Sequence, residues 1–272
     1  MVSLSIRLFT EDDIPSALAL CRSAGWNQLH EDWSRLIEYQ PNGCFAADLD
    51  GQLVGTVTTT SYGTALAWIG MMLVHEDFRC RGIATELMNA SLDYLRDQQV
   101  GCIKLDATPA GQPVYERLGF QAECSFHRWS RDGNEKRDRP VLADTLRTSV
   151  LNMDRVAFGA DRTRWLQRLA DGSEVIVRSR GFGMLRSGFL ADYLGPVVAE
   201  DPETARQIVV ELISRSATTV FWDLPQDNPG VAALAHSLGF KPIRDLTRMW
   251  TGSNLVAPAM NLQYALSDPS TG

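Results

Sequence analysis

The chain has 272 residues and a net charge of −7, with 44% hydrophobic and 22% charged residues. This composition is typical of a globular protein, and the length suits two domains of ordinary size. The acidic balance argues against nucleic acid or an anionic membrane surface as the main partner. No apolar run approaches the ~20 residues that a membrane-spanning helix needs. We therefore expect neither a nucleic-acid-binding protein nor a membrane protein.

The five cysteines are odd in number, widely spread and without a C-x-x-C pair. The first residues lack the basic, apolar and small-residue order of a secretory signal. These features predict reduced thiols in a cytoplasmic protein, with neither a disulfide framework nor a metal site.

In chain order, the first half alternates strands and helices, as judged from hydrophobic periodicity and from Gly, Pro and Asp at the boundaries. Asp50-Gly51 is a strong hairpin signal. The continuously apolar residues 66–74 are typical of a buried strand. The expected order is a strand and helix in 5–26, a helix in 30–43, a hairpin in 44–63, a strand at 66–74, a helix at 82–100, a strand at 102–108, a helix at 111–120 and a strand at 121–130.

A polar, charge-rich stretch at 131–140 is typical of a linker, and the second half then repeats the pattern of the first more faintly. Leu238-Gly239-Phe240 ends a helix as Leu118-Gly119-Phe120 ends its counterpart. We interpret this as a duplication at domain scale. The predicted organisation is a first domain at 1–132, a linker at 133–145 and a second domain at 146–272.

The segment FRCRGIATELM, residues 78–88, places Arg79, Arg81 and Gly82 at a helix entrance. The first turn of a helix leaves N–H groups unpaired, and the helix dipole adds positive charge there. Glycine lets the backbone approach a ligand closely, and the Thr85 hydroxyl adds a donor. The segment therefore suits two neighbouring phosphates, although a solvated helix start would have the same composition. It matches neither a Walker A loop nor a G-x-G-x-x-G fingerprint.

Arg79-x-x-Gly82-x-Ala84, placed after the strand at 66–74, resembles the acetyl-CoA pyrophosphate loop of the GNAT superfamily of N-acetyltransferases. The segment VYERLGF resembles the closing helix of that family, with Tyr115 and Gly119-Phe120. More narrowly, the chain resembles a two-domain bacterial subgroup, the YitH-like acetyltransferases. The resemblance implies an α/β fold of two tandem GNAT-like domains, each with a mixed, mostly antiparallel sheet, a splayed central strand pair and flanking helices.

The resemblance also implies roles for residues of the first domain. Tyr115 would act as general acid and return a proton to the CoA thiolate, or would simply pack beneath the sheet. Thr108 stands where many members carry Asn, which puts the usual side-chain contact with the pantetheine in doubt. Backbone groups of Met72, Leu73 and Val74 would bind the pantetheine arm. The pyrophosphate would be bound by Arg79, Cys80, Arg81, Gly82, Ile83, Ala84 and Thr85.

The acceptor amine must lose a proton before it attacks, so a base is needed. Asp106 is the preferred candidate, and a carboxylate that accepts N–H groups of the following loop is the alternative. Residues 25–33 lie where the family places a variable substrate lid, in which Trp26, Asn27 and His30 would contact the substrate. Trp33 is expected in the core. Other candidate bases are His75, Glu31, Asp32 and His30.

The second domain has no corresponding loop, because Glu200 and Asp201 would repel a pyrophosphate and Ala235 stands in the place of Tyr115. It would complete the substrate pocket, mediate a homodimer or bind a small regulator. Its arginines would either recognise a carboxylate or lie solvated on strand edges. They are Arg178, Arg180 and Arg186.

The sequence therefore predicts an N-acetyltransferase that uses acetyl-CoA, without a metal, to acetylate a primary amine of a small molecule. The amine would attack directly in a ternary complex. The alternative is a sensor that binds CoA or a small ligand and transfers little or nothing.

Overall fold

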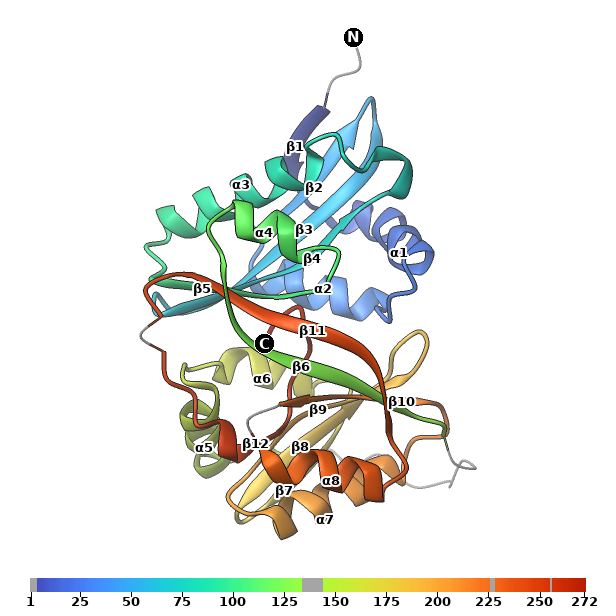
Figure 1. Ribbon diagram of the computed structural model, residues 1–272, viewed down its shortest axis with the longest axis vertical. Helices are drawn as coiled ribbons and strands as arrows, with labels where there is room; N and C mark the ends of the chain where they lie inside the picture. Colours follow the sequence, from blue (N-terminus) through green and yellow to red (C-terminus); the bar gives the residue numbers. More distant parts are fainter. Residues whose placement is uncertain (1–3, 134–143, 226–227, 255) are drawn as a thin grey trace.

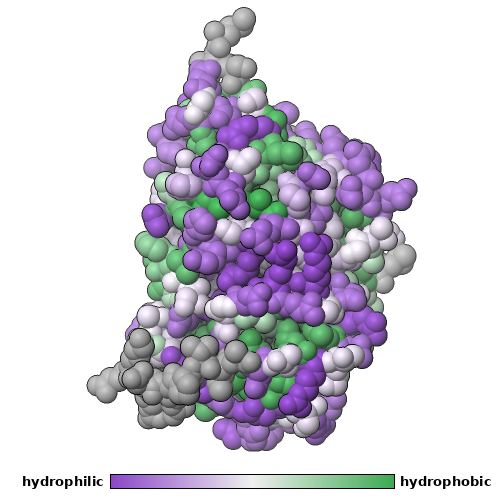
Figure 2. All heavy atoms as spheres, turned by 180° about the vertical axis from the view of Figure 1, so that it is seen from behind, coloured by the Kyte–Doolittle hydropathy of each residue, from purple (hydrophilic) through white to green (hydrophobic). Residues whose placement is uncertain are grey.

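The computed structural model describes residues 4–133, 144–225, 228–254 and 256–272. Two lobes are stacked along the long axis, and the long strands β6 and β11 run between them (Figure 1). Most of the predicted linker, residues 134–143, lies outside the described residues, so the domain boundaries stay a prediction. On the face behind Figure 1, hydrophilic residues form a band at the height where the lobes meet (Figure 2).

The first half contains the expected strands and helices. The hairpin turn at Asp50-Gly51 is confirmed, and both residues have positive φ, 52° and 85°, as a tight two-residue hairpin turn requires. Its elements are β1 (Leu4–Leu8), α1 (Ile14–Ser23), α2 (His30–Tyr39), β2 (Cys44–Leu49), β3 (Gln52–Tyr62), β4 (Leu66–Val74), α3 (Ile83–Asp97), β5 (Cys102–Ala107), α4 (Gln112–Arg117) and β6 (Gln121–Arg131).

The described part of the second half repeats this order from α1 onward, without a counterpart of β1 and with one strand added near its end. That strand, β12, pairs with β9. The elements are α5 (Thr148–Phe158), α6 (Thr163–Ala170), β7 (Ser173–Arg178), β8 (Gly181–Arg186), β9 (Asp192–Ala199), α7 (Pro202–Ile213), β10 (Val220–Pro225), α8 (Pro229–Ser237), β11 (Lys241–Gly252) and β12 (Gln263–Ala265).

The two halves exchange their last long strands. β6 of the first half pairs with β10 of the second, and β11 of the second half pairs with β5 of the first. β6 and β11 also pair with each other, so the described strands form one continuous sheet in the order β1-β2-β3-β4-β5-β11-β6-β10-β9-β8-β7. The mixed sheet flanked by helices is confirmed. The sheets of the two halves, expected to be separate, are joined.

Two buried ion pairs hold the exchanged strands in place. Arg248 on β11 donates to both carboxylate oxygens of Asp106 on β5, at 2.9 and 3.0 Å. Arg128 on β6 donates to both oxygens of Asp223 on β10, at 2.8 and 2.9 Å. The two arginines stand at the same distance after the repeated Leu-Gly-Phe, so each half supplies an arginine at the equivalent position. Each arginine pairs with an aspartate of the other half.

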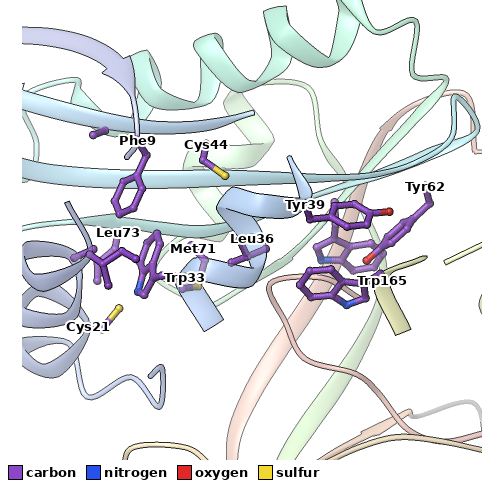
Figure 3. Packing of buried hydrophobic residues seen from close by; sticks show 14 of the residues in the cluster. Phe9, Cys21, Trp33, Leu36, Tyr39, Cys44, Tyr62, Met71, Leu73 and Trp165 are labelled. Carbon is purple, nitrogen blue, oxygen red and sulfur yellow. The ribbon is translucent and has the colours of Figure 1, made fainter. Parts of the chain in front are cut away.

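The halves also share a hydrophobic core. The ring of Trp165 from α6 packs edge-on against Tyr39 of α2, with centroids 5.3 Å apart, and Figure 3 shows the two rings beside Tyr62. Phe158 of α5 packs against Tyr62 at 5.1 Å. At the other end of the same cluster Trp33 is fully buried, as expected.

We predict that Arg248→Met lowers the free energy of unfolding by about 3–5 kcal/mol, because Asp106 is left buried without its partner. The double variant Asp106→Leu/Arg248→Met should recover most of the loss. Urea unfolding of both variants measures this. Arg96→Met, which removes an exposed ion pair with Asp93, is the control and should cost about 1 kcal/mol or less. Equal losses for Arg96→Met and Arg248→Met would contradict the interpretation.

Candidate functional site

The strands β4 and β5 form the expected splayed pair. They pair in parallel at three positions only, the last of them Trp68 with Lys104, and β4 then continues to Val74 without β5 as a neighbour. A bulge at Met71, whose φ is +50°, shifts the register of β4 against β3. The Thr56 hydroxyl donates to the Met71 carbonyl at 2.8 Å and fixes the bulge. The last part of β4 therefore has no partner strand on its β5 side, and the gap between the two strands is referred to below as the cleft.

The helix α3 begins next to the end of β4 with an open first turn. Gly82 precedes the helix with φ +84°, and no heavy atom lies within 4 Å of the position that a Cβ would take there. The N–H of Glu86 donates to the Gly82 carbonyl at 3.1 Å, so the N–H groups of residues 83–85 precede the first helical hydrogen bond. Cys80, with φ +61°, turns the chain into this position. The predicted anion loop thus has the geometry of an anion site.

The two arginines of the loop are tied to its backbone. Arg79 donates through Nε to the Val74 carbonyl at 3.1 Å, and Arg81 donates through Nη2 to the Asp77 carbonyl at 2.9 Å. Each guanidinium keeps further N–H groups for which the described residues provide no acceptor. Arg79 thereby takes one of the two acceptor positions of the carbonyl of Val74, which the sequence predicts, with Met72 and Leu73, to bind the pantetheine arm.

Tyr115 lies on α4, half-buried, with its ring 6.2 Å from that of Phe120. Burial raises the pKa of its hydroxyl to about 12, so the group is protonated at neutral pH. Thr108 ends β5, and its carbonyl and hydroxyl oxygens both accept the N–H of Gly111. Thr108 therefore fixes the turn that leads into the helix of Tyr115.

Asp106 points to the opposite face of the sheet from Tyr115, since its neighbour Ala107 packs in the same cluster as Tyr115. Its side chain is fully buried and paired with Arg248. The alternative role predicted for Asp106 was to accept N–H groups of the following loop. Among the described residues, its carboxylate oxygens accept from Arg248 instead. Burial raises the pKa of Asp106 to about 6, although the Arg248 guanidinium opposes this shift.

The comparisons with known proteins agree with this geometry. The model of the acetyltransferase (GNAT) family matches residues 11–120, and that of an acetyltransferase (GNAT) domain matches residues 150–265. The chain belongs to the GNAT family of acetyltransferases. Members of this family transfer acetyl groups and generally take them from acetyl-CoA. We refer below to the first and second GNAT domains.

Several similar proteins match this chain over most of its length and over most of their own. The uncharacterized N-acetyltransferase YitH of Bacillus subtilis is 24% identical over 243 residues, which cover 85% of each chain. A solved structure from Pyrococcus horikoshii, described as that of an acetyltransferase, is 25% identical with a TM-score of 0.86 and covers 99% of this chain and 96% of its own. A GCN5-related N-acetyltransferase of Sphaerobacter thermophilus shares the fold, with a TM-score of 0.63 at 14% identity and coverage of 99% and 98%. Among the described residues, no helix is long and apolar enough to span a membrane.

The other candidate bases lie outside the cleft. His30 and Glu31 are exposed, and His30 interacts with the Ser34 hydroxyl at 3.2 Å. His75 caps the turn after β4 by accepting the Asp77 N–H at 3.3 Å. Asp32 differs from these, because burial raises the pKa of its carboxyl and it lines a pocket between the two GNAT domains.

This pocket is enclosed by α2 and the loop before it, by α6, β8 and β9 of the second domain, by Arg128 on β6 and by the segment that follows β12. Arg186 is a lining residue for which the sequence predicts carboxylate binding as one alternative. For most of the other lining residues the sequence predicts no role. The repeated arginine after Leu-Gly-Phe was the available signal for Arg128. The lining residues are Asn27, Gln28, Asp32, Arg35, Leu36, Arg128, Trp165, Leu169, Arg186, Ser187, Tyr193, Asp268, Pro269, Ser270 and Thr271.

Asn27 lines the pocket, but its amide is largely occupied. Its Oδ1 accepts the N–H groups of Leu190 and Ala191 at 2.7 and 2.9 Å, and its Nδ2 donates to the Ala191 carbonyl at 2.9 Å. Asn27 therefore holds the β8–β9 loop of the second domain against the first. Trp26 is half-buried against the first-domain core and does not line the pocket, and neither does His30.

Of the three arginines considered for carboxylate binding, Arg178, Arg180 and Arg186, only Arg186 is buried. It donates to Asp268 at 3.0 Å and to the carbonyls of Gly195 and Ser267 at 3.3 and 3.2 Å. Arg178 pairs with Glu211, and Arg180, which is exposed, pairs with Glu200. Arg178 and Arg180 therefore fit the alternative prediction, in which these arginines lie at the protein surface.

The second domain has its own splayed strand pair, but the chain itself fills the gap. β9 and β10 pair at three positions, the last of them Leu194 with Trp222. Beyond this point the Leu266 N–H donates to the Asp223 carbonyl at 3.0 Å, and a Cβ on Gly195 would collide with the Leu266 carbonyl. Trp222 Nε1 donates to the Tyr264 carbonyl at 2.8 Å. The cleft that would hold a cofactor here is occupied by residues 264–266.

The same segment then crosses to β4 of the first domain. Trp68 Nε1 donates to the Pro269 carbonyl at 3.2 Å, and the Tyr62 hydroxyl donates to the Thr271 carbonyl at 2.6 Å. Ser270 lies so close to Gly70 that a Cβ there would collide with its backbone. Residues 269–271 thus form a wall of the pocket beside the start of the open cleft.

We predict that Gly70→Ala displaces this wall and lowers the free energy of unfolding by about 1–3 kcal/mol, because the added methyl group meets backbone. Gly101→Ala is the matched control, since its Cβ would have its nearest neighbour at 3.7 Å. Hydrogen exchange at the Ser270 and Thr271 amides should quicken in the first variant and stay unchanged in the second. Unchanged exchange in both would contradict the close contact.

Proposed function

We propose that the chain transfers the acetyl group of acetyl-CoA to a primary amine of a small molecule, by direct attack in a ternary complex. The observation that carries the proposal is the unpaired first turn of α3 at the end of the splayed β4. Residues 82–85 and the two arginines would bind the pyrophosphate, and backbone groups of Met72 and Leu73 would bind the pantetheine arm.

In the proposed reaction, the nitrogen lone pair of the amine attacks the thioester carbon and the carbon–sulfur bond breaks. The thiolate then takes the proton of the Tyr115 hydroxyl. A phenol of pKa about 12 is a weak acid, but burial also raises the pKa of a thiol, because it disfavours the thiolate. Proton transfer between two such groups needs little driving force.

Asp106 is the proposed base for the proton that the amine loses. A carboxylate with a raised pKa, about 6, suits proton uptake near neutral pH. Arg248 would keep the carboxylate oriented throughout. The acid and the base then lie on opposite faces of the sheet, with the cleft between them.

A sensor that binds CoA without transfer remains the second candidate. The filled cleft of the second domain supports it, because it indicates that a GNAT fold here has lost a cofactor site. Tyr115 favours transfer, since a sensor has no use for an acid beside the thiol.

We predict that Gly82→Glu abolishes acetyl-CoA binding measured by calorimetry, because a carboxylate would occupy the anion loop. Gly239→Glu is the matched control: Gly239 has the same φ of +84° and equally open surroundings, but lies in the second domain. The control should bind like the unaltered chain. Loss of binding in both would point to backbone strain, and binding retained in both would overturn the proposed cofactor site.

We predict that Tyr115→Phe lowers kcat at least 100-fold, the scale of general acid catalysis, and changes the KM for acetyl-CoA less than twofold. Release of CoA thiol over a panel of primary amines measures this. Tyr94→Phe, which removes only a hydrogen bond from Gln40, should leave kcat unchanged. An unchanged kcat in Tyr115→Phe would exclude the acid role. Tight binding of CoA by the unaltered chain without thiol release from any amine would favour the sensor.

A further inference from the structure

The pocket between the two GNAT domains contains buried polar atoms without partners. Gln28 Oε1, an acceptor, and Trp165 Nε1, a donor, belong to lining residues and have no hydrogen-bond partner among the described residues. Trp165 is only 2% exposed. A buried polar group left unpaired destabilises the fold, because it has lost its hydrogen bonds to water. A ligand with both a donor and an acceptor would remove that destabilisation.

The loop before α2 and its first turn supply acceptors. Asp32 accepts the Leu29 N–H at 2.8 Å and Arg35 Nη1 at 3.1 Å. A carboxylate has about four acceptor positions, so two remain. Together with the amide oxygen of Gln28, this end of the pocket suits the N–H donors of an amine or ammonium group.

The opposite wall supplies N–H donors from two guanidinium groups, whose charges are balanced by Asp223 and Asp268. Arg128 uses Nε and Nη2 on Asp223 and Tyr193, and its Nη1 has no acceptor among the described residues. Arg186 uses Nη1 and Nη2, and its Nε has none there. Both guanidinium groups lie over the ring of Tyr193, at 5.0 and 4.4 Å from its centroid. Two neighbouring guanidinium groups with N–H groups to spare suit a carboxylate.

We propose that this pocket binds the acceptor substrate and that the substrate is a small free amino acid. Its amino group faces Gln28 and Asp32, and its carboxylate is bound by Arg128 and Arg186, with Trp165 Nε1 as a further donor. This inference rests on the proposed function, which it narrows to one substrate class.

The position of the pocket agrees with this role. Leu36, which lines it, packs in the same cluster as Met71 at the β4 bulge, where the open cleft begins. Residues 269–271 form the wall between pocket and β4. The pocket thus lies on the face of the sheet onto which Met71 packs, with residues 269–271 between it and residues 68–70 of β4.

Calorimetry on the full chain without acetyl-CoA tests the pocket directly. The probes are alanine, serine, leucine and lysine, each compared with its carboxamide, which keeps the amine and lacks the carboxylate. We expect at least one amino acid to bind ten times more tightly than its amide. Equal binding of every pair, or no binding of any amino acid, would overturn the proposal.

Two variants assign the contacts. Gln28→Met keeps the side-chain length and removes the acceptor, and Trp165→Phe keeps the aromatic packing on Tyr39 and removes the donor. Each should weaken amino-acid binding at least tenfold, and Gln28→Met should leave the unfolding midpoint unchanged. Gln207→Met, on the exposed surface of α7, is the control and should bind normally. Unchanged binding in both pocket variants would contradict the assignment.

The binding experiment and the transfer experiment test the two proposals independently. Amino-acid binding without any CoA release would leave the pocket intact and overturn the transferase. CoA release with simple amines, together with amino acids that do not bind, would leave the transferase intact and overturn the pocket.

Discussion

The exchange of β6 and β11, fixed by two buried arginine–aspartate pairs, determines the rest of the architecture. Each pair joins a strand of one half to a strand of the other, so separating the halves would leave four charges without partners. The cost of an unpaired buried charge is several kcal/mol. The exchange therefore fixes the second domain against the first, so that Trp165, Tyr193 and Arg186 line a pocket between the two domains.

The duplicated fold uses its splayed strands in two ways. In the first domain the gap stays open beside an unpaired helix start, and in the second it is filled by residues 264–266. The filling segment continues to β4 of the first domain, where Gly70 leaves room for it. A second cofactor site is thus replaced by a wall of the pocket. The missing loop motif and the filled cleft are two independent reasons to expect no acetyl-CoA there.

Local sequence predicted what depends on local geometry. The order of elements and the Asp50-Gly51 turn follow from periodicity and turn chemistry. The strand exchange could not be predicted this way, because β6 would pair with β5 or with β10 by the same apolar pattern. The partner of Asp106 was missed for that reason, since Arg248 lies 142 residues away. Asn27 was interpreted as a substrate contact because nothing near it in the sequence indicates the loop that it holds.

The arrangement separates the binding of the cofactor from the choice of acceptor. The groups proposed for acetyl-CoA come from β4, α3 and α4 of the first domain. The unpartnered polar atoms of the pocket come from other elements, the α1–α2 loop of the first domain and α6 of the second. A substitution on α6 or β8 can therefore change which acceptor fits without touching the anion loop. The ion pairs that fix the exchange set a limit on this freedom. Arg128 both holds Asp223 and lines the pocket, so the donor wall cannot be changed at that residue without a loss of stability.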